Sequence, residues 1–187
     1  MRGMIIIAVS LFSFSGVALA QIPTSGNVFF GYSYVNTSVS PISRTSTNGW
    51  EFTAEGKIFP FVGIVADFSS YYGSQDFPAA ACAPLNPACS PAVINVGLNQ
   101  QNYLFGPRVS ISISKFRPFA EATIGAGHLN AHAAGSGTSF ATALGGGLDY
   151  KLFHIIAWRF QGDYLRTRFF SAAQNNVRLS TGIVVRF

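Results

Sequence analysis

The sequence predicts an all-β protein, an eight-stranded antiparallel up-and-down transmembrane β-barrel with short turns at one end and long loops at the other. Three observations lead to this fold. Only 10% of the 187 residues are charged and 49% are hydrophobic, whereas soluble domains carry roughly 25% charged residues. Apolar and polar residues alternate through most of the chain. Beyond the first twenty residues, no apolar run is long enough for a spanning helix, which needs about 20 residues.

The first twenty residues have the pattern of a cleaved signal peptide. Arg2 supplies a positive start, residues 5–14 supply an apolar core, and positions 18–20 have the small-x-small pattern that signal peptidase accepts. We therefore expect export, with residues 1–20 removed and residues 21–187 forming one barrel domain. A retained membrane anchor is the alternative, but the apolar run is short and interrupted by serines.

Eight segments alternate between an apolar and a polar face, which is the pattern of a strand with different surroundings on its two sides. In one of them, Trp50 and Phe52 share a parity, and Glu51 and Glu55 share the other. The eight expected strands lie at residues 28–34, 50–58, 62–69, 103–110, 116–126, 140–150, 156–164 and 177–187.

Every charged residue within these strands lies on the polar parity. A Lys or Arg that faces lipid at mid-bilayer costs about 2 to 4 kcal/mol, so this arrangement predicts lipid outside and charges in the lumen. The six acids and six bases are Glu51, Glu55, Asp67, Glu121, Asp149 and Asp163, with Lys57, Arg108, Arg117, Arg159, Arg178 and Arg186.

An eight-stranded barrel is just wide enough for side chains to fill. We therefore expect the lumen charges to form a structural, salt-bridged plug, and a gate that opens by exchange of ion-pair partners is the alternative. Arg108 and Glu121 are nearly symmetric about a tight turn, so they should form a cross-strand pair. Glu55 and Asp67 should lie at similar height, where two like charges need an intervening Arg or a proton.

Two other classes of protein fit the composition poorly. The twelve Lys and Arg residues are scattered singly, so the net charge of +5 gives no basic tract for nucleic acid. A soluble barrel has the opposite polarity, and strips such as Trp50/Phe52 on its water-facing exterior would favour aggregation.

The connections between the expected strands alternate in length. Short connections fit periplasmic turns and long ones fit extracellular loops. The short connections are 58–61, 111–115 and 150–154, and the long ones are 36–49, 70–101, 126–139 and 166–176.

Aromatic and basic residues lie where a membrane barrel meets the headgroups. Aromatic residues with polar tips form interfacial girdles in membrane proteins, and basic residues at that level can meet anionic headgroups. The aromatic candidates are Trp50, Tyr72, Tyr103, Trp158 and Tyr164, and the basic ones are Arg44, Arg166 and Arg168.

With these features, the chain resembles the small eight-stranded outer-membrane barrels of the OmpA and OmpX type, including the related opacity-type surface proteins. The resemblance covers residues 27–187 through topology and patterning. Its most specific element is the alternating end of the chain, which closes on Phe187 and looks like the signal that the outer-membrane assembly machinery recognises. The resemblance implies a bacterial outer-membrane location in contact with lipid and lipopolysaccharide. We expect a monomer.

Cys82 and Cys89 lie in the longest expected loop. Two cysteines in one loop of an exported protein favour a disulfide. A metal site is not expected, because no His or clustered carboxylate accompanies the two thiols.

His128 and His132 flank another expected loop, and His154 lies near a short turn. A pairing of His128 with Ser136 or Ser139 would suit a hydrolase, but no Gly-x-Ser-x-Gly motif occurs. We therefore expect a non-enzymatic outer-membrane scaffold without cofactors, whose loops serve adhesion, protection or envelope integrity. A small gated pore and a lipid-modifying enzyme are the alternatives.

Overall fold

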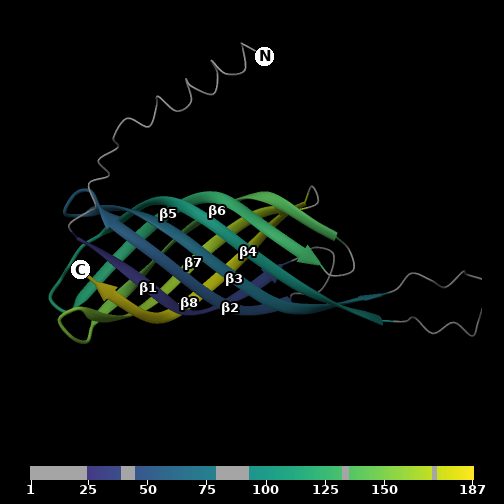
Figure 1. Cartoon of the computed structure of the whole chain (residues 1–187), viewed down its shortest axis with the longest axis horizontal. Helices are drawn as coiled ribbons and strands as arrows, with labels where there is room; N and C mark the ends of the chain where they lie inside the picture. The colour runs from purple at the N-terminus through teal and green to yellow at the C-terminus, as the bar shows by residue number, and fades with distance from the viewer. Residues whose placement is uncertain (1–24, 39–44, 79–92, 132–134, 170–171) are drawn as a thin grey trace, which may run out of the picture.

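The chain folds into one closed antiparallel barrel of eight strands (Figure 1). The computed structural model describes residues 25–38, 45–78, 93–131, 135–169 and 172–187. The strands are β1 Gly26–Ser38, β2 Thr45–Lys57, β3 Val62–Pro78, β4 Val93–Ser110, β5 Phe116–Ala131, β6 Gly135–Lys151, β7 Ile156–Phe169 and β8 Ala172–Arg186. Each strand pairs with its neighbours in sequence, and β8 pairs with β1. The predicted fold is confirmed.

In the described residues, no helix is long and apolar enough to cross a membrane.

The connections at the end of the barrel that holds the C-terminus are short, as the sequence predicts. They comprise residues 58–61, 111–115 and 152–155. Ser114 has a left-handed backbone, with φ of 57°, and the turn around it is closed by two hydrogen bonds between Ile113 and Phe116, of 2.8 and 2.9 Å. Gly26 and Phe187 also exchange backbone hydrogen bonds here, so both ends of the barrel sequence meet at this rim.

At the opposite end the strands run farther than predicted. The expected loops 36–49, 70–101, 126–139 and 166–176 are too long, because pairing continues to Thr37 with Thr45, Pro78 with Val93, Ala131 with Gly135 and Phe169 with Ala172. Apolar and polar residues alternate along a strand only where its two faces have different surroundings. Backbone pairing requires no such difference, so it continues where the side-chain pattern ends. Figure 1 shows β3 and β4 extending farthest at this end.

The barrel is apolar outside and charged inside. Large apolar side chains face outward, among them Phe30, Phe140 and Leu144, which are 61%, 64% and 66% exposed. Arg108 and Arg178, by contrast, lie inside the barrel with no exposed area. This is the reverse of the polarity of a soluble barrel, in which the apolar faces point inward.

Candidate functional site: the charged lumen

The twelve predicted lumen charges all lie at inward-facing strand positions. Ten of them are buried, and the most accessible of these, Arg117, is 6% exposed. Lys57 and Arg186 are only half-buried, because they are the last residues of β2 and β8 and lie at the end of the barrel that carries the short turns. Lys57 Nζ donates to Ser110 Oγ and to the Pro60 carbonyl, each at 2.9 Å, so its partners are neutral oxygens.

The half of the lumen nearest the short turns contains an excess of bases, and we call it the basic cluster. Its acids are Glu55, Glu121 and Asp149, and its bases are Lys57, Arg108, Arg117, Arg159 and Arg186. Five bases and three acids give a formal charge of +2.

Arg108 is central to the basic cluster. Its guanidinium binds Glu121 Oε2 at 2.5 and 2.6 Å and Glu55 Oε2 at 3.3 Å. Arg117 binds the other oxygen of Glu55 at 3.0 Å. Arg159 holds Asp149 through two hydrogen bonds of 2.7 and 3.1 Å. The first three ion pairs join β2, β4 and β5, and the last joins β6 and β7. Asn27 on β1 connects the two groups, because its side chain accepts a hydrogen bond from Arg159 at 3.2 Å and donates one to Glu55 at 2.6 Å.

The next layer toward the long hairpins is the acidic cluster, made of Glu51, Asp67, Asp163 and Arg178. Its formal charge is −2, since three acids surround one base. Arg178 lies 2.6 Å from Asp67 Oδ2, 2.7 Å from Asp163 Oδ2 and 3.6 Å from Glu51 Oε2. A single guanidinium from β8 therefore links β2, β3 and β7.

Gln161 connects the two clusters. Its side-chain amide nitrogen lies 3.0 Å from Glu121 in the basic cluster, and 3.2 and 2.9 Å from Glu51 and Asp163 in the acidic cluster. Ser180 also donates a short hydrogen bond to Glu51. The lumen is thus one continuous polar network in which charged groups are held by ion pairs and by neutral hydrogen-bond donors and acceptors.

The predicted pair of Arg108 and Glu121 is confirmed, since the two residues are direct register partners on β4 and β5. The expectation for Glu55 and Asp67 is wrong. The register places Asp67 opposite Thr53, so Glu55 and Asp67 lie at different heights. Each has its own arginine partner, and no shared proton or cation is needed.

Comparison with known proteins identifies the fold. The chain superposes on Neisserial surface protein A with a TM-score of 0.66 and 13% identity, covering 87% of this chain and 97% of that one. OprG from Pseudomonas aeruginosa gives a TM-score of 0.58 with 10% identity, covering 87% and 95%. Ail, the attachment invasion locus protein of Yersinia pestis, gives 0.56 with 12% identity, covering 87% and 98%.

The fold is that of a small outer-membrane β-barrel. No protein-family model and no curated protein matches the sequence, so the likeness is one of architecture. The sequence-based resemblance to this class of barrel is confirmed at the level of the fold.

The outer-membrane barrel fold also holds lumen residues that the charge pattern does not reveal. The ring of Phe119 packs between two guanidiniums, with centroid distances of 4.6 Å to Arg108 and 4.5 Å to Arg159, in the range of cation–π contacts. Gly147 faces this ring, and a Cβ there would lie 2.8 Å from Phe119 Cζ. The sequence signal that identifies Phe119 as inward-facing is strand alternation, because Phe119 lies midway between the inward-facing Arg117 and Glu121.

Of the two serines predicted as partners of His128, the structure excludes Ser139. Strand alternation places Ser139 on the opposite face of the sheet from His128, so these two residues cannot form a dyad. Ser136 shares the face of His128 but is the register partner of Asn130, two residues farther along β5. The residue directly opposite His128 is Thr138, whose Oγ1 lies 2.9 Å from His128 Nδ1. All six Asp and Glu residues with described side chains point into the lumen, away from His128. His154 is exposed in the turn 152–155.

Several expectations fall outside the described residues. The signal peptide 1–20, the Cys82–Cys89 disulfide and His132 all lie there, as do the side chains of Arg44 and Arg168. Phe187 is described, but its role in assembly stays a prediction. The structural or gating role of the lumen charges is considered below.

Proposed function

We propose that the chain is an integral outer-membrane protein whose barrel is a closed, non-enzymatic scaffold, and whose outward hairpins make the functional contacts outside the cell. The observation that carries this proposal is the polarity of the barrel. Aromatic and aliphatic side chains cover its exterior, and ten charged side chains are buried in its interior. Such a surface suits lipid, which requires an apolar band about 25 Å tall.

The positions of the aromatic side chains support membrane insertion. Tyr150 and Trp158 are register partners close to the short turns, and both face outward. Tyr72 and Tyr103 face outward on β3 and β4, toward the other end. Amphipathic rings at two levels are typical of the interfacial girdles of outer-membrane barrels.

The packing of the lumen supports a scaffold over an open pore. The side chains of Arg108 and Arg178 are fully buried and are held by carboxylates from other strands. A gated pore remains the second candidate, because Arg178 has three carboxylate partners and could exchange one for another. Any such exchange would have to break buried ion pairs.

The β3–β4 hairpin supports contacts outside the cell. Beyond Tyr72, six further register pairs run from Gly73 with Leu98 to Pro78 with Val93. At about 3.4 Å per residue, this paired segment is about 20 Å long. Binding residues often lie on loops held by a rigid scaffold, and the barrel supplies that scaffold. Ail is described as an attachment invasion locus protein, so attachment is one form that such contacts take.

Truncation of this hairpin tests the proposal. Residues 74–97 are replaced by an Asn-Gly turn, a sequence that favours two-residue hairpins. The control chain carries the same turn in place of residues 132–134, between β5 and β6. We expect both chains to fold, as judged by heat-modifiable electrophoretic mobility. Adhesion of cells displaying the protein to matrix-coated surfaces should fall to background for the β3–β4 truncation alone.

Two outcomes would contradict this proposal. Equal adhesion by the full-length and β3–β4-truncated chains would exclude this hairpin as the contact. Discrete conductance steps from the full-length protein in planar bilayers, altered by Glu121→Gln, would contradict a closed scaffold and favour the gated pore.

A further inference from the structure

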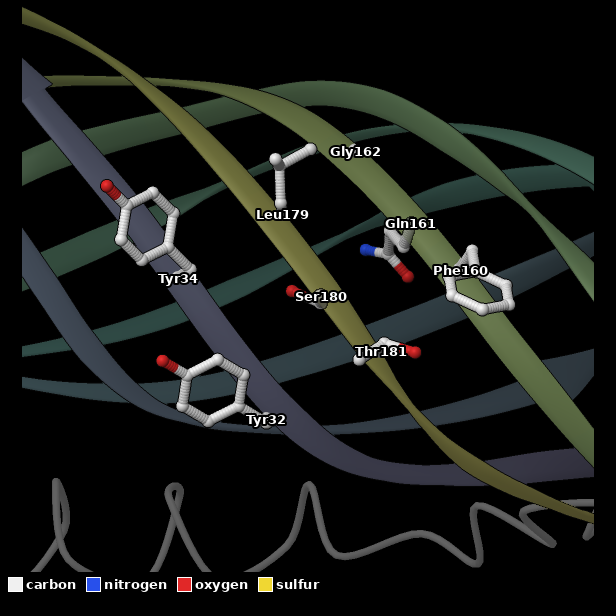
Figure 2. A pocket seen from close by; sticks show the side chains of 8 residues that line it. All are labelled: Tyr32, Tyr34, Phe160, Gln161, Gly162, Leu179, Ser180 and Thr181. Carbon is white, nitrogen blue, oxygen red and sulfur yellow. The ribbon is translucent and has the colours of Figure 1, made fainter.

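A groove of about 490 Å³ lies on the exterior of the barrel, across β7, β8 and β1 (Figure 2). The groove exists because Gly162, which faces outward on β7, has no side chain. Register pairing places Gly162, Leu179 and Tyr34 in one outward-facing row. Phe160 and its partners form the row on the side of the short turns. Gly162 therefore leaves a depression between Phe160 and Leu179.

The polar groups around this groove are already bonded. The hydroxyl of Tyr32 donates to Asn48 Oδ1 at 2.6 Å, and the hydroxyl of Tyr34 lies 2.7 Å from Ser46 Oγ. Thr181 Oγ1 accepts a hydrogen bond from Trp158 at 2.9 Å and donates to the Arg159 carbonyl at 3.1 Å. What remains for a ligand is ring faces and methyl groups, which suit an alkyl chain rather than a polar molecule.

Gln161 and Ser180 also border the groove, but their polar side chains do not reach into it. Both are buried and bind carboxylates in the lumen, so they border the groove through their backbones. The groove is therefore apolar although it follows a polar strand sequence.

A cation lies beyond the groove on the same face of β7. The outward-facing positions continue from Gly162 through Tyr164 to Arg166, which is exposed. Among the residues whose side chains are described, Arg166 is the one Asp, Glu, Lys or Arg at an outward-facing strand position. Four residues of strand separate its Cα from that of Gly162 by about 13 Å.

The depth of Arg166 matches the headgroup region. The outward-facing residues of β7 from Ile156 to Tyr164 are apolar or aromatic, apart from Gly162, and Arg166 follows directly. Nine residues of a strand tilted by about 40° span about 23 Å, close to the apolar band of an outer-membrane barrel. The cation thus lies at the outer edge of this band, and the groove lies within it.

We propose that this face is a binding site for a phosphate-bearing lipid of the outer leaflet. One acyl chain lies in the groove over Gly162, and the lipid phosphate pairs with Arg166. The inference rests on the proposed membrane location and adds a defined lipid site to it. Charge complementarity identifies the headgroup, and the apolar lining identifies the chain.

Native mass spectrometry of the folded full-length barrel in detergent tests this site, with added lipid A as the probe. We expect the native chain to retain one lipid A molecule, and to retain the fully dephosphorylated lipid about fivefold less, which is the contribution of one cation near an anionic membrane. Arg166→Gln should lower the retention of lipid A to the level of the dephosphorylated lipid. Gly162→Leu should lower the retention of both lipids, because its side chain fills the groove.

Matched variants keep the test specific. Lys115→Gln removes an exposed cation from a short turn, and Ala122→Leu adds an alkyl group to the exterior of β5; neither should change retention. A Cβ at Gly162 would make only ordinary contact, 3.5 Å from Leu179, and Gly162→Ala is the second variant if the leucine chain does not fold.

Failure of the lipid site and failure of the proposed membrane location would give different results. Equal retention of lipid A by the native, Gly162→Leu and Arg166→Gln chains would overturn the lipid site. Equal retention of both lipids by the native chain would overturn the pairing of phosphate with Arg166. Failure of the native chain to fold in detergent would instead contradict the proposed membrane location.

Discussion

Replacement of Arg178 with Met should lower the free energy of unfolding of the barrel by about 3 to 5 kcal/mol, the cost of removing one partner from a buried ion pair. Arg178 has no exposed area, and its partners Glu51, Asp67 and Asp163 are at most 3% exposed. Methionine fills much of the same volume but leaves three carboxylates without their shared cation. Because the acidic cluster is already formally −2, the substitution increases its imbalance.

Denaturant unfolding of the folded barrel in lipid vesicles measures this effect. Lys115→Met removes the same charge from an exposed turn and should change the unfolding free energy by less than about 0.5 kcal/mol. Arg178→Lys, which keeps the cation but loses the planar fork, should be intermediate. If Arg178→Met is no more destabilising than Lys115→Met, the lumen is hydrated and the account of a packed plug is wrong. If Arg178→Met does not fold, the lysine variant provides the comparison.

Leu144→Arg should destabilise the barrel in lipid by about 2 to 4 kcal/mol, the cost of an arginine that faces the bilayer midplane. Leu144 is 66% exposed on the exterior of β6, between Phe140 and Leu148. Its register partners are Ala122 and Tyr164, so no carboxylate on the barrel surface lies opposite it, and the cost arises mainly from the surrounding lipid.

The matched control for this substitution is Leu152→Arg. Leu152 is also exposed, at 45%, but it lies in the short turn after β6, where headgroups and water can solvate an arginine. Its cost should be about 1 kcal/mol or less, as for charged residues near the interface. Equal destabilisation by the two arginines in vesicles would indicate that Leu144 does not face lipid.

The positions and facing of the strands could be predicted because a physical penalty enforces them. A charge at an outward-facing position of the band costs several times the thermal energy, so Glu51 and Glu55 mark the inward parity of β2 and thereby identify its lipid face. No such penalty acts beyond the apolar band. The continuation of β3 to Pro78 therefore carries no periodic signal, although its backbone remains paired with β4.

The contacts inside the lumen were predictable only where a short turn fixes the register. The turn 111–115 sets Arg108 opposite Glu121. Contacts across the barrel, such as Arg178 with Asp67, depend on strand stagger and on side-chain conformations that sequence spacing does not specify. The error over Glu55 and Asp67 has the same origin, because a shift of two residues in register places Asp67 opposite Thr53.

Aromatic residues inside the lumen were missed for a different reason. Phe119 is buried between Arg108 and Arg159, yet a pattern analysis based on hydrophobicity assigns phenylalanine to the lipid side. Only its parity relative to Arg117 and Glu121 identifies it as inward-facing. Parity is therefore a better guide than residue type in a barrel whose lumen is filled by side chains.

The central claim, that this barrel faces lipid outside and holds a packed polar network inside, is tested most directly by a nitroxide scan along β7. Spin labels placed singly from Ile156 to Tyr164 are compared in vesicles for collision with oxygen, which partitions into lipid, and with a water-soluble nickel complex. We expect high oxygen collision at the even-numbered positions, which face lipid, and low collision with either reagent at the odd-numbered ones, which face the lumen. Strong collision with the nickel complex at Phe160 and Gly162 would contradict the central claim.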